Sequence, residues 1–409
     1  MRVLVTGATG YLGGRLVPRL IDAGHSVRVL VRNPRKLRDV PWRDDVEVAV
    51  GDLTDASTLV DAVEGMDALY YLVHAMGAAG DFEKTEKLSA RNVASAAKKA
   101  GVSRIVYLGG LHPEGDISQL SRHLRSRAEV GNILLKSGVP TIAFNAGVVI
   151  GSGSASFEMI RHLTEVLPYM PAPKWVRNFI QPIAVRDVLY YLVSALELPD
   201  DLNRSFDIGG PDVLRYGQMM NGYALEAGLH QRPIASLPVL TPWLASQWVN
   251  LVTPIPRLLA VPIIESLQFD CVVRDESVSD FISEPEGGLT SYRASVRLAL
   301  VKMSDGEVET SWQDATVVGA PSDPIPSDPE WTGHTVYTDL RERKTSASAD
   351  ALWAVVEGIG GENGWYSFPL AWALRGWLDK LVGGVGLRRG RRHPTTLNTG
   401  DALDFWRVE

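Results

Sequence analysis

The chain has 409 residues, which suggests two or three domains because a domain typically holds about 150 residues. Hydrophobic residues make up 45% of the chain and charged residues 22%, the balance of an ordinary soluble globular protein. The formal net charge of −7 argues against nucleic acid as a partner, because domains that bind it are usually strongly basic. The single cysteine, Cys271, excludes an internal disulfide and a multi-cysteine zinc site, and we predict no metal site.

Short apolar runs alternate with helical patterns over the first 150 residues. The predicted strands are Val3–Thr6, Ser26–Val31, Val46–Val50, Ala68–Val73, Arg104–Leu108 and Thr141–Phe144. The predicted helices between them are Tyr11–Ala23, Ser57–Val63, Phe82–Ala100 and Leu120–Ser137. Because each crossover between parallel strands is right-handed, this alternation predicts an α/β fold with a doubly wound, Rossmann-type parallel sheet.

A glycine-rich loop joins the first predicted strand to the first predicted helix. Its glycines permit a tight turn, close approach of the backbone to a pyrophosphate and close packing of helix on strand. The free N–H groups and the dipole at the helix start then favour the bound anion. The residues expected to hold a dinucleotide here are Gly7, Thr9, Gly10, Tyr11, Leu12 and Gly13.

The end of the second predicted strand indicates which dinucleotide is preferred. No Asp or Glu occurs from Val27 to Lys36, whereas Arg32 supplies a cation that suits a ribose 2′-phosphate. We therefore expect NADP rather than NAD, the alternative being a solvated basic helix end. Asp52, with Leu53 after the third strand, lies where an adenine amino group is expected, although Asp52 could instead cap the next element.

The remaining chain divides by composition. Residues 1–285 are predicted to form the dinucleotide-binding domain, with a smaller lid and substrate portion at about 151–285. Residues 286–330 are rich in turn-forming residues and predict a linker, and residues 331–409 form a separate module. Nine of the 11 tryptophans fall after residue 240, so the two ends of the chain differ in composition.

The most apolar stretch, residues 236–267, is interrupted by five prolines and is therefore not a membrane span. It predicts short buried helices beside a pocket for a small apolar ligand. The alternative is a surface that contacts a membrane or a partner. Met1–Thr6 is strand-like and lacks the pattern of a secretory signal, so we expect a cytoplasmic protein, with membrane association as the alternative.

These motifs resemble the atypical and extended short-chain dehydrogenase/reductase superfamily, in particular its NmrA-like, NAD(P)H-binding branch. The resemblance covers about residues 1–285, and the glycine loop is its most specific part. The residues on which the resemblance rests are Thr6–Gly13, Asp52–Leu53, Leu72–Ala75, Asn92, Gly147–Gly151 and Phe206–Pro211. The resemblance implies that Val73, His74 and Ala75 approach the central ribose of the cofactor, and that Ala146 and Gly147 lie near the nicotinamide. Packing of strand ends is the alternative.

The sequence departs from the superfamily at the expected catalytic residues. The superfamily uses a Tyr general acid, a Lys that lowers its pKa and a Ser that orients the substrate, but no Tyr-x-x-x-Lys pair occurs between residues 108 and 135. The corresponding helix carries His123 and Arg127. His123 suits proton transfer near neutral pH, Arg127 could hold the nicotinamide ribose, and Ser121 is a candidate hydrogen-bond donor to substrate. The alternative is that these are solvated helix residues and that the site binds cofactor without turnover.

The tryptophan-rich end resembles a domain of unknown function that is found fused behind NmrA-like reductase halves. Its opening, a predicted strand Thr335–Glu342 followed by helices Ala349–Gly358 and about Leu370–Val382, resembles the START/polyketide-cyclase helix-grip fold. Such a domain usually needs more residues than are present here, so we expect an incomplete module whose tryptophans are exposed or covered by the first domain.

Three functions remain open from the sequence. The first is an NAD(P)H-dependent oxidoreductase that acts on an apolar carbonyl or quinone-like substrate. The second is a sensor or assembly factor that binds NADP(H) without turnover. The third is a protein that binds a lipid or polyketide and uses the Rossmann part as a scaffold.

Overall fold

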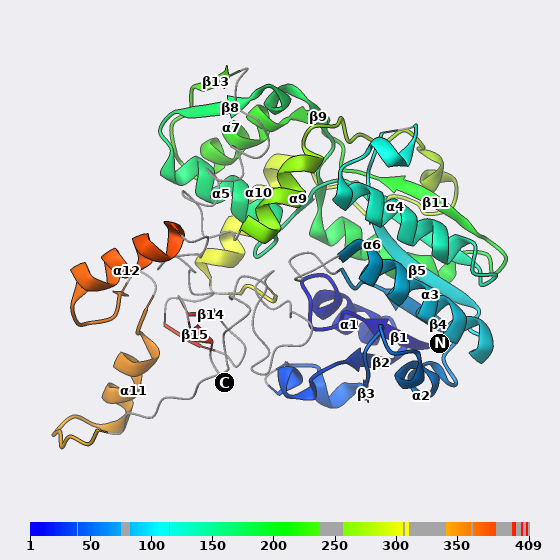
Figure 1. The fold of residues 1–409 in the computed structure, drawn as a ribbon, viewed down its shortest axis with the longest axis horizontal. Coiled ribbons are helices and arrows are strands. Elements are labelled where there is room, and N and C mark those ends of the chain that lie inside the picture. Colours follow the sequence, from blue (N-terminus) through cyan, green and yellow to red (C-terminus); the bar gives the residue numbers. More distant parts are fainter. Residues whose placement is uncertain are drawn as a thin grey trace.

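The computed structural model describes residues 1–38, 40–74, 82–113, 115–237, 257–305, 307–310, 341–360, 363–381, 395–397, 402–403 and 406–407. At its centre is a seven-stranded sheet with helices on both faces, shown at the lower right of Figure 1. Above it in that view, a second group of helices forms the lid portion.

Seven parallel strands form the central sheet in the order β11-β6-β5-β4-β1-β2-β3. Their bounds are β1 Arg2–Thr6, β2 Ser26–Val31, β3 Glu47–Val50, β4 Ala68–Tyr71, β5 Arg104–Gly110, β6 Thr141–Ala146 and β11 Arg204–Ile208. The chain order reverses between β1 and β4, which is where doubly wound sheets bind their ligands. The prediction of a doubly wound parallel sheet is confirmed, and β11 is a strand that the sequence did not predict.

Each face of the sheet is covered by its own helices because successive strand residues point to opposite sides. Val3 and Val5 of β1 pack against α1 (Gly13–Asp22) and α6 (Val185–Ser194). Leu4, between them, belongs to the core on the opposite face. That face is covered by α2 (Leu59–Val63), α3 (Phe82–Ala100) and α4 (Arg122–Leu135).

A second hydrophobic core holds the lid portion together. It packs α5 (Ala155–Val166), α7 (Tyr216–Glu226), α9 (Arg257–Ser266) and α10 (Tyr292–Ser304) around Phe157 and Tyr223. Short strands join these helices: β7 Val149–Ile150, β8 Met170–Pro173, β9 Phe179–Ile180, β10 Ile183–Ala184, β12 Leu214–Arg215 and β13 Ile234–Leu237.

The structure corrects the prediction of a linker at 286–330. Ser291 caps α10, whose residues Tyr292, Val296 and Ala299 are buried in the second core. Their apolar spacing of three and four residues places them on one helix face, which packs on the lid. The folded first unit therefore extends at least to Ser304. The turn-rich residues around Gly287 and Gly288, which favour a linker, only precede this helix.

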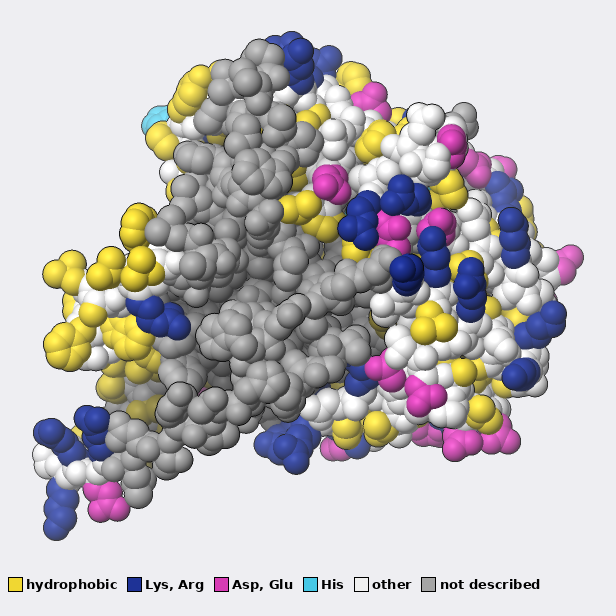
Figure 2. Space-filling view, viewed as in Figure 1, with side chains coloured by type: hydrophobic (Ala, Val, Ile, Leu, Met, Phe, Trp, Pro, Cys, Tyr) yellow, Lys and Arg dark blue, Asp and Glu magenta, His cyan; other side chains and the backbone are white. Residues whose placement is uncertain are grey.

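In the tryptophan-rich segment, the two predicted helices are confirmed as α11 (Ala349–Glu357, capped by Ser348) and α12 (Pro369–Leu381). A short antiparallel pair follows, β14 (Ala402–Leu403) and β15 (Trp406–Arg407). Residues 335–340 of the predicted strand lie outside the described residues, and the helix-grip fold stays a prediction. Trp353 is 63% exposed and Trp377 is 56% exposed, and hydrophobic side chains gather over α12 in Figure 2.

No helix in the described part of the chain has both the length and the apolar character needed to cross a membrane. Residues 238–256 of the apolar stretch lie outside the described residues. Its described end forms α9, in which Ile264 is 1% exposed.

Candidate functional site

The loop between β1 and α1 has a shape that only glycine permits. Gly7 has a φ of 77°, a left-handed conformation that other residues rarely adopt. A Cβ atom on Gly13 would lie 2.1 Å from the carbonyl oxygen of Gly7. No side chain caps α1. The N–H groups of Gly14 and Arg15 donate to the carbonyl oxygens of Gly10 and Leu12, and the positive end of the helix dipole faces the loop, which favours an anion there. This cradle fits the pyrophosphate of a dinucleotide.

One pocket of about 470 Å³ runs from this loop along the carboxyl ends of the strands to the lid. It brings together nearly all of the residues predicted for the cofactor and for catalysis. The predicted residues that line it are Gly7, Thr9, Gly10, Tyr11, Leu12, Gly13, Arg32, Asp52, Leu53, Val73, His74, His123, Arg127, Ala146 and Gly147. Ala75 lies outside the described residues.

At the adenine end of the pocket, an Asx turn orders Asp52. Its Oδ1 accepts hydrogen bonds from the backbone N–H and the hydroxyl of Thr54, at 2.8 and 2.7 Å. Asn92 of α3 supports the same turn, because its Nδ2 donates to the carbonyl oxygens of Leu53 and Thr54. Asp52 thus serves the local turn and lines the pocket, while Asp55 caps the following short helix. Arg32 and Lys36 line the pocket beside the end of β2.

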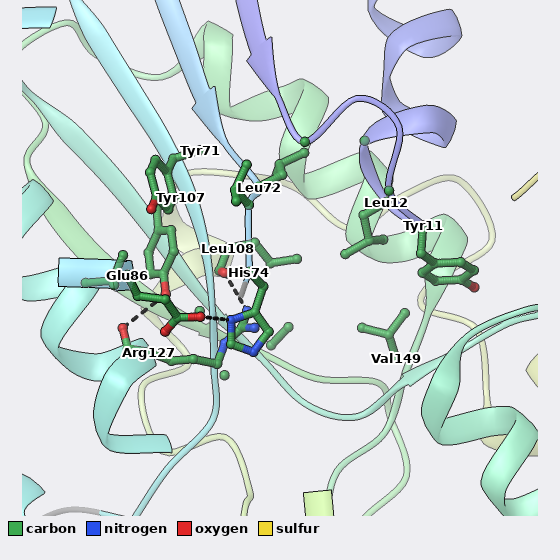
Figure 3. A pocket seen from close by; sticks show the side chains of 18 of the residues that line it. Tyr11, Leu12, Tyr71, Leu72, His74, Glu86, Tyr107, Leu108, Arg127 and Val149 are labelled. Atoms are coloured by element: carbon green, nitrogen blue, oxygen red, sulfur yellow. Dashed lines mark hydrogen bonds and ion pairs between the residues drawn. The ribbon is translucent and has the colours of Figure 1, made fainter. Parts of the chain in front are cut away.

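Two histidines and a carboxylate form a chain in the pocket wall. His74, after β4, contacts the Glu86 carboxylate of α3 through Nδ1. The Nε2 atom of His74 lies 3.2 Å from Nδ1 of His123 on α4. The hydroxyl of Ser126 donates to the other oxygen of Glu86. Figure 3 shows Glu86 and His74 joined in this way, across the pocket from Tyr11 and Val149.

The surroundings of His123 favour its neutral form. The pKa of His123 lies well below its ordinary value, mainly because burial disfavours the charged imidazolium. The neighbouring charges of His74 and Arg127 lower this pKa further, whereas Glu86 opposes them. His123 is therefore a neutral imidazole near neutral pH, able to exchange a proton with a group in the pocket.

Arg127 lies where the superfamily resemblance implies a lysine, one helical turn after His123. Its guanidinium donates a 2.6 Å hydrogen bond to the carbonyl oxygen of Leu108, and its Nε is buried without a partner. The Tyr107 hydroxyl in turn donates to the carbonyl oxygen of Arg127 at 3.0 Å. An orphaned buried donor fits a ligand that supplies an acceptor, such as a ribose hydroxyl.

Ser121 does not take the place predicted for it. It is not one of the residues that line the pocket; its hydroxyl caps α4 by accepting from the Leu124 N–H. The same oxygen lies 3.0 Å from Oγ of Ser266 on α9, so Ser121 ties the helix start to the lid. An N-cap serine at this position explains its presence without a role in binding substrate.

The lid closes the other end of the pocket with apolar side chains. Ile180, Tyr216, Ile263 and Leu267 line it, together with the buried thiol of Cys271. Burial raises the pKa of Cys271 to about 12, so this group is a neutral thiol that behaves as a small apolar residue. Among the described residues, no cluster of three or more metal-ligating side chains is present.

Glu86 is the site residue that the sequence did not reveal. It lies within the polar run Glu83–Arg91, where a single buried carboxylate has no distinguishing pattern. Its neighbours on α3 include Ser89 and Ala90, both buried, and this small-residue face indicates only that the helix packs closely. Contact with His74 arises from tertiary packing of α3 beside the end of β4.

The comparisons with known proteins agree with this geometry. Residues 7–136 match a family described as NAD(P)H-binding, and residues 331–409 match a family described as a protein of unknown function (DUF2867). Residues 7–136 are thus similar to NAD(P)H-binding domains, and the curated relatives described next are dehydrogenases and reductases.

Two curated relatives are reductases or dehydrogenases. A stretch of 116 residues is 37% identical to the 3 beta-hydroxysteroid dehydrogenase/Delta 5-->4-isomerase of Mycobacterium tuberculosis, covering 26% of this chain and 30% of that protein. The chain thus spans about a third of the length of that relative. A longer stretch of 220 residues is 29% identical to the (4-alkanoyl-5-oxo-2,5-dihydrofuran-3-yl)methyl phosphate reductase of Streptomyces griseus, covering 52% of this chain and 69% of that protein.

Among solved structures, the fold is similar to the triphenylmethane reductase of Citrobacter sp. complexed with NADP(H). The TM-score is 0.56 and the identity 18%, over 73% of this chain and all of that one (100%). An identity this low shows a shared fold alone.

Proposed function

We propose that this protein is an NADPH-dependent oxidoreductase that reduces an apolar carbonyl or quinone-like substrate. The observation that carries the proposal is the single pocket that joins the glycine loop, His123 and the apolar wall of the lid. A binding protein needs the loop and a substrate wall, but it does not need a proton-exchanging group between them.

His123 is the proposed proton donor to the substrate oxygen. Its Nδ1 is engaged with His74, and the described residues offer no hydrogen-bond partner to its Nε2. A ring nitrogen of a pocket-lining residue is placed to deliver a proton to an oxygen that gains charge during reduction. Reduced nicotinamide, when bound, would supply the hydride. The donors on Arg127 would hold the ribose, since its guanidinium keeps its charge at every physiological pH.

The preference for NADPH rests on the cations beside β2. Arg32 and Lys36 line the pocket at the adenine end, and neither Asp nor Glu from this strand end lines it. A carboxylate there would favour a ribose 2′-hydroxyl, whereas guanidinium and ammonium groups favour a 2′-phosphate.

The substrate class follows from the lid. Aliphatic and aromatic side chains of β9, α7 and α9 form the far wall of the pocket. Transfer from water to this wall is therefore most favourable in free energy for a largely apolar ligand. The similarity to a hydroxysteroid dehydrogenase supports a carbonyl or alcohol as the reacting group.

A screen of NADPH oxidation against apolar ketones, aldehydes and quinones tests the proposal. We expect turnover with the unaltered chain and a loss of about a hundredfold or more in His123→Ala, the usual contribution of a positioned acid. The matched control is His230→Ala, which removes an exposed histidine that does not line the pocket. NADPH binding, measured by fluorescence, should survive in both variants.

The competing function is a sensor that binds NADP(H) without turnover. It is favoured by the absence of a Tyr-x-x-x-Lys pair between residues 108 and 135, where this chain carries His123 and Arg127 instead. Tight NADPH binding with no oxidation of cofactor across the substrate panel would establish the sensor and reject the oxidoreductase.

A further inference from the structure

A buried carboxylate is linked to His123 through a second histidine. Glu86 is 4% exposed, and its two oxygens are engaged by different partners, Nδ1 of His74 and the hydroxyl of Ser126. The imidazole of His74 is 17% exposed and uses both of its ring nitrogens, one toward Glu86 and the other toward His123. The three groups therefore form one hydrogen-bonded row that ends at Nε2 of His123.

We propose that Glu86 and His74 form a proton relay that recharges His123 during turnover. This inference rests on the proposed function and deepens it, because it assigns two positioning residues that do not have to touch substrate. A carboxylate only accepts hydrogen bonds, so His74 carries a proton on Nδ1 and can exchange a second one through Nε2.

The charges around the row let the two histidines share one extra proton. The negative charge of Glu86 favours a cation on the pair, whereas Arg127 and the mutual repulsion of the two rings oppose a second one. Tyr71 and Tyr107 also face Glu86 and stay neutral, since burial raises the pKa of both phenols, that of Tyr107 to about 12. In the proposed relay, the row is a carboxylate beside two histidines that share one extra proton.

One turnover of the relay delivers one proton to the substrate oxygen and takes up one proton from water. With a reduced nicotinamide bound to supply the hydride to the carbonyl carbon, the carbonyl oxygen would take the proton from Nε2 of His123. The proton on Nε2 of His74 then moves across the 3.2 Å hydrogen bond to Nδ1 of His123. His74 ends neutral with its remaining proton on the Glu86 side. Uptake of one proton from water at Nε2 of His123, followed by return of the shared proton from Nδ1 of His123 to Nε2 of His74, restores the starting state.

The first arm of the test needs no substrate. Nitrogen-15-labelled histidine in the full chain reports, by NMR, on which ring nitrogens carry protons and on the pH at which the pair loses its shared one. In Glu86→Gln this loss should move to lower pH, because a neutral amide no longer stabilises the cation. Glu83→Gln is the matched control: it removes the same charge from the same helix, at a residue paired with Arg122 and Arg125.

The second arm measures kcat/KM against pH for the reductive direction. In Glu86→Gln, the limb that falls at high pH should move to lower pH in step with the NMR titration. The loss at about pH 8 should be at least about tenfold. Glu83→Gln should keep the profile of the unaltered chain. His74→Gln, a second variant, should lower kcat at every pH while KM for NADPH is retained.

The outcomes separate the two claims. An NMR titration that moves while the kinetic limb stays in place overturns the relay and leaves the oxidoreductase intact. Equal effects of Glu86→Gln and Glu83→Gln overturn the relay as well, since they indicate a general loss of charge. Absence of turnover in the unaltered chain removes the proposed function, and the relay with it.

Discussion

The chemistry of this site depends on residues that local sequence patterns identify only in part. Glycines at fixed spacing between a strand and a helix predict a phosphate cradle because no other residue fits, and Gly7 and Gly13 meet that requirement. His123 could be suggested from the position of a missing tyrosine. Its contact with His74, 49 residues earlier in the chain, could not, because only the packed sheet and helices bring the two rings together.

Substitution of Gly13 should strongly weaken binding of the cofactor. A methyl group in Gly13→Ala would lie 2.1 Å from the Gly7 carbonyl oxygen, so the loop must open to accept it. We expect NADPH affinity to fall by about a hundredfold or more, since the N–H groups would no longer converge on the pyrophosphate. Isothermal titration would measure the loss. Gly131→Ala, on α4 and with its nearest neighbour at 3.4 Å, serves as control, and equal affinity losses would contradict this account.

Substitution of Arg32 should change the preference between cofactors. Arg32→Ala is expected to weaken NADPH binding by about tenfold or more, because a charge-assisted hydrogen bond to a phosphate contributes about 1.5–3 kcal/mol. NADH has no 2′-phosphate, so its affinity should change little. Parallel titrations of the two cofactors give the ratio. If both affinities fell equally, Arg32 would have no role in selecting the phosphate.

At the scale of elements, residues 307–310 fasten the chain after α10 to the glycine loop. Arg15 of α1 is 4% exposed; its Nε donates to Oγ1 of Thr310, and its Nη2 donates to the Ser152 carbonyl oxygen, each at 2.8 Å. The Thr310 hydroxyl donates in turn to the Tyr11 carbonyl oxygen at 2.7 Å. Helix α1, the lid and the segment leading to the second module therefore meet at one buried guanidinium.

Removal of this guanidinium should destabilise the fold. Arg15→Ala leaves the Ser152 carbonyl and Thr310 without their buried donor, at an expected cost of about 2–3 kcal/mol in the free energy of unfolding. Urea unfolding measures the change. Arg19→Ala, one turn later, removes a half-exposed ion pair with Glu309 and should cost less than about 1 kcal/mol. A larger loss in Arg19→Ala than in Arg15→Ala would contradict this assignment.

At the scale of the whole molecule, the pocket is assembled from parts that are far apart in the chain. The glycine loop follows β1, His74 follows β4, His123 lies on α4, and the apolar wall comes from the lid, including α9. Alternating apolar runs predicted the sheet from β1 to β6, because buried parallel strands need such runs. Strand β11 could not be predicted, because Arg204, Ser205 and Asp207 interrupt its apolar pattern. Helix α10 was not predicted, because the turn-rich residues before it favour a linker.

Burial of His123 should make the stability of the protein depend on pH. Its pKa lies well below the ordinary value when folded, whereas the unfolded chain takes up a proton near pH 6.5. The unfolded state therefore binds more protons below about pH 6.5, so the free energy of unfolding should fall as the pH drops from about 7 to about 5. His123→Gln should flatten this slope, and the exposed His230→Gln should retain it. Equal slopes in all three proteins, measured by urea unfolding, would disprove the assignment.

The transfer of deuterium is the most direct test of the central claim. NADPH deuterated at its transferable nicotinamide position would be incubated with an apolar ketone or quinone, and the product analysed by mass spectrometry. With a ketone, we predict one deuterium on the carbinol carbon with the unaltered chain, and a loss of that product in His123→Ala although NADPH still binds. Binding of NADPH without any labelled or reduced product, across the whole substrate panel, would contradict the account.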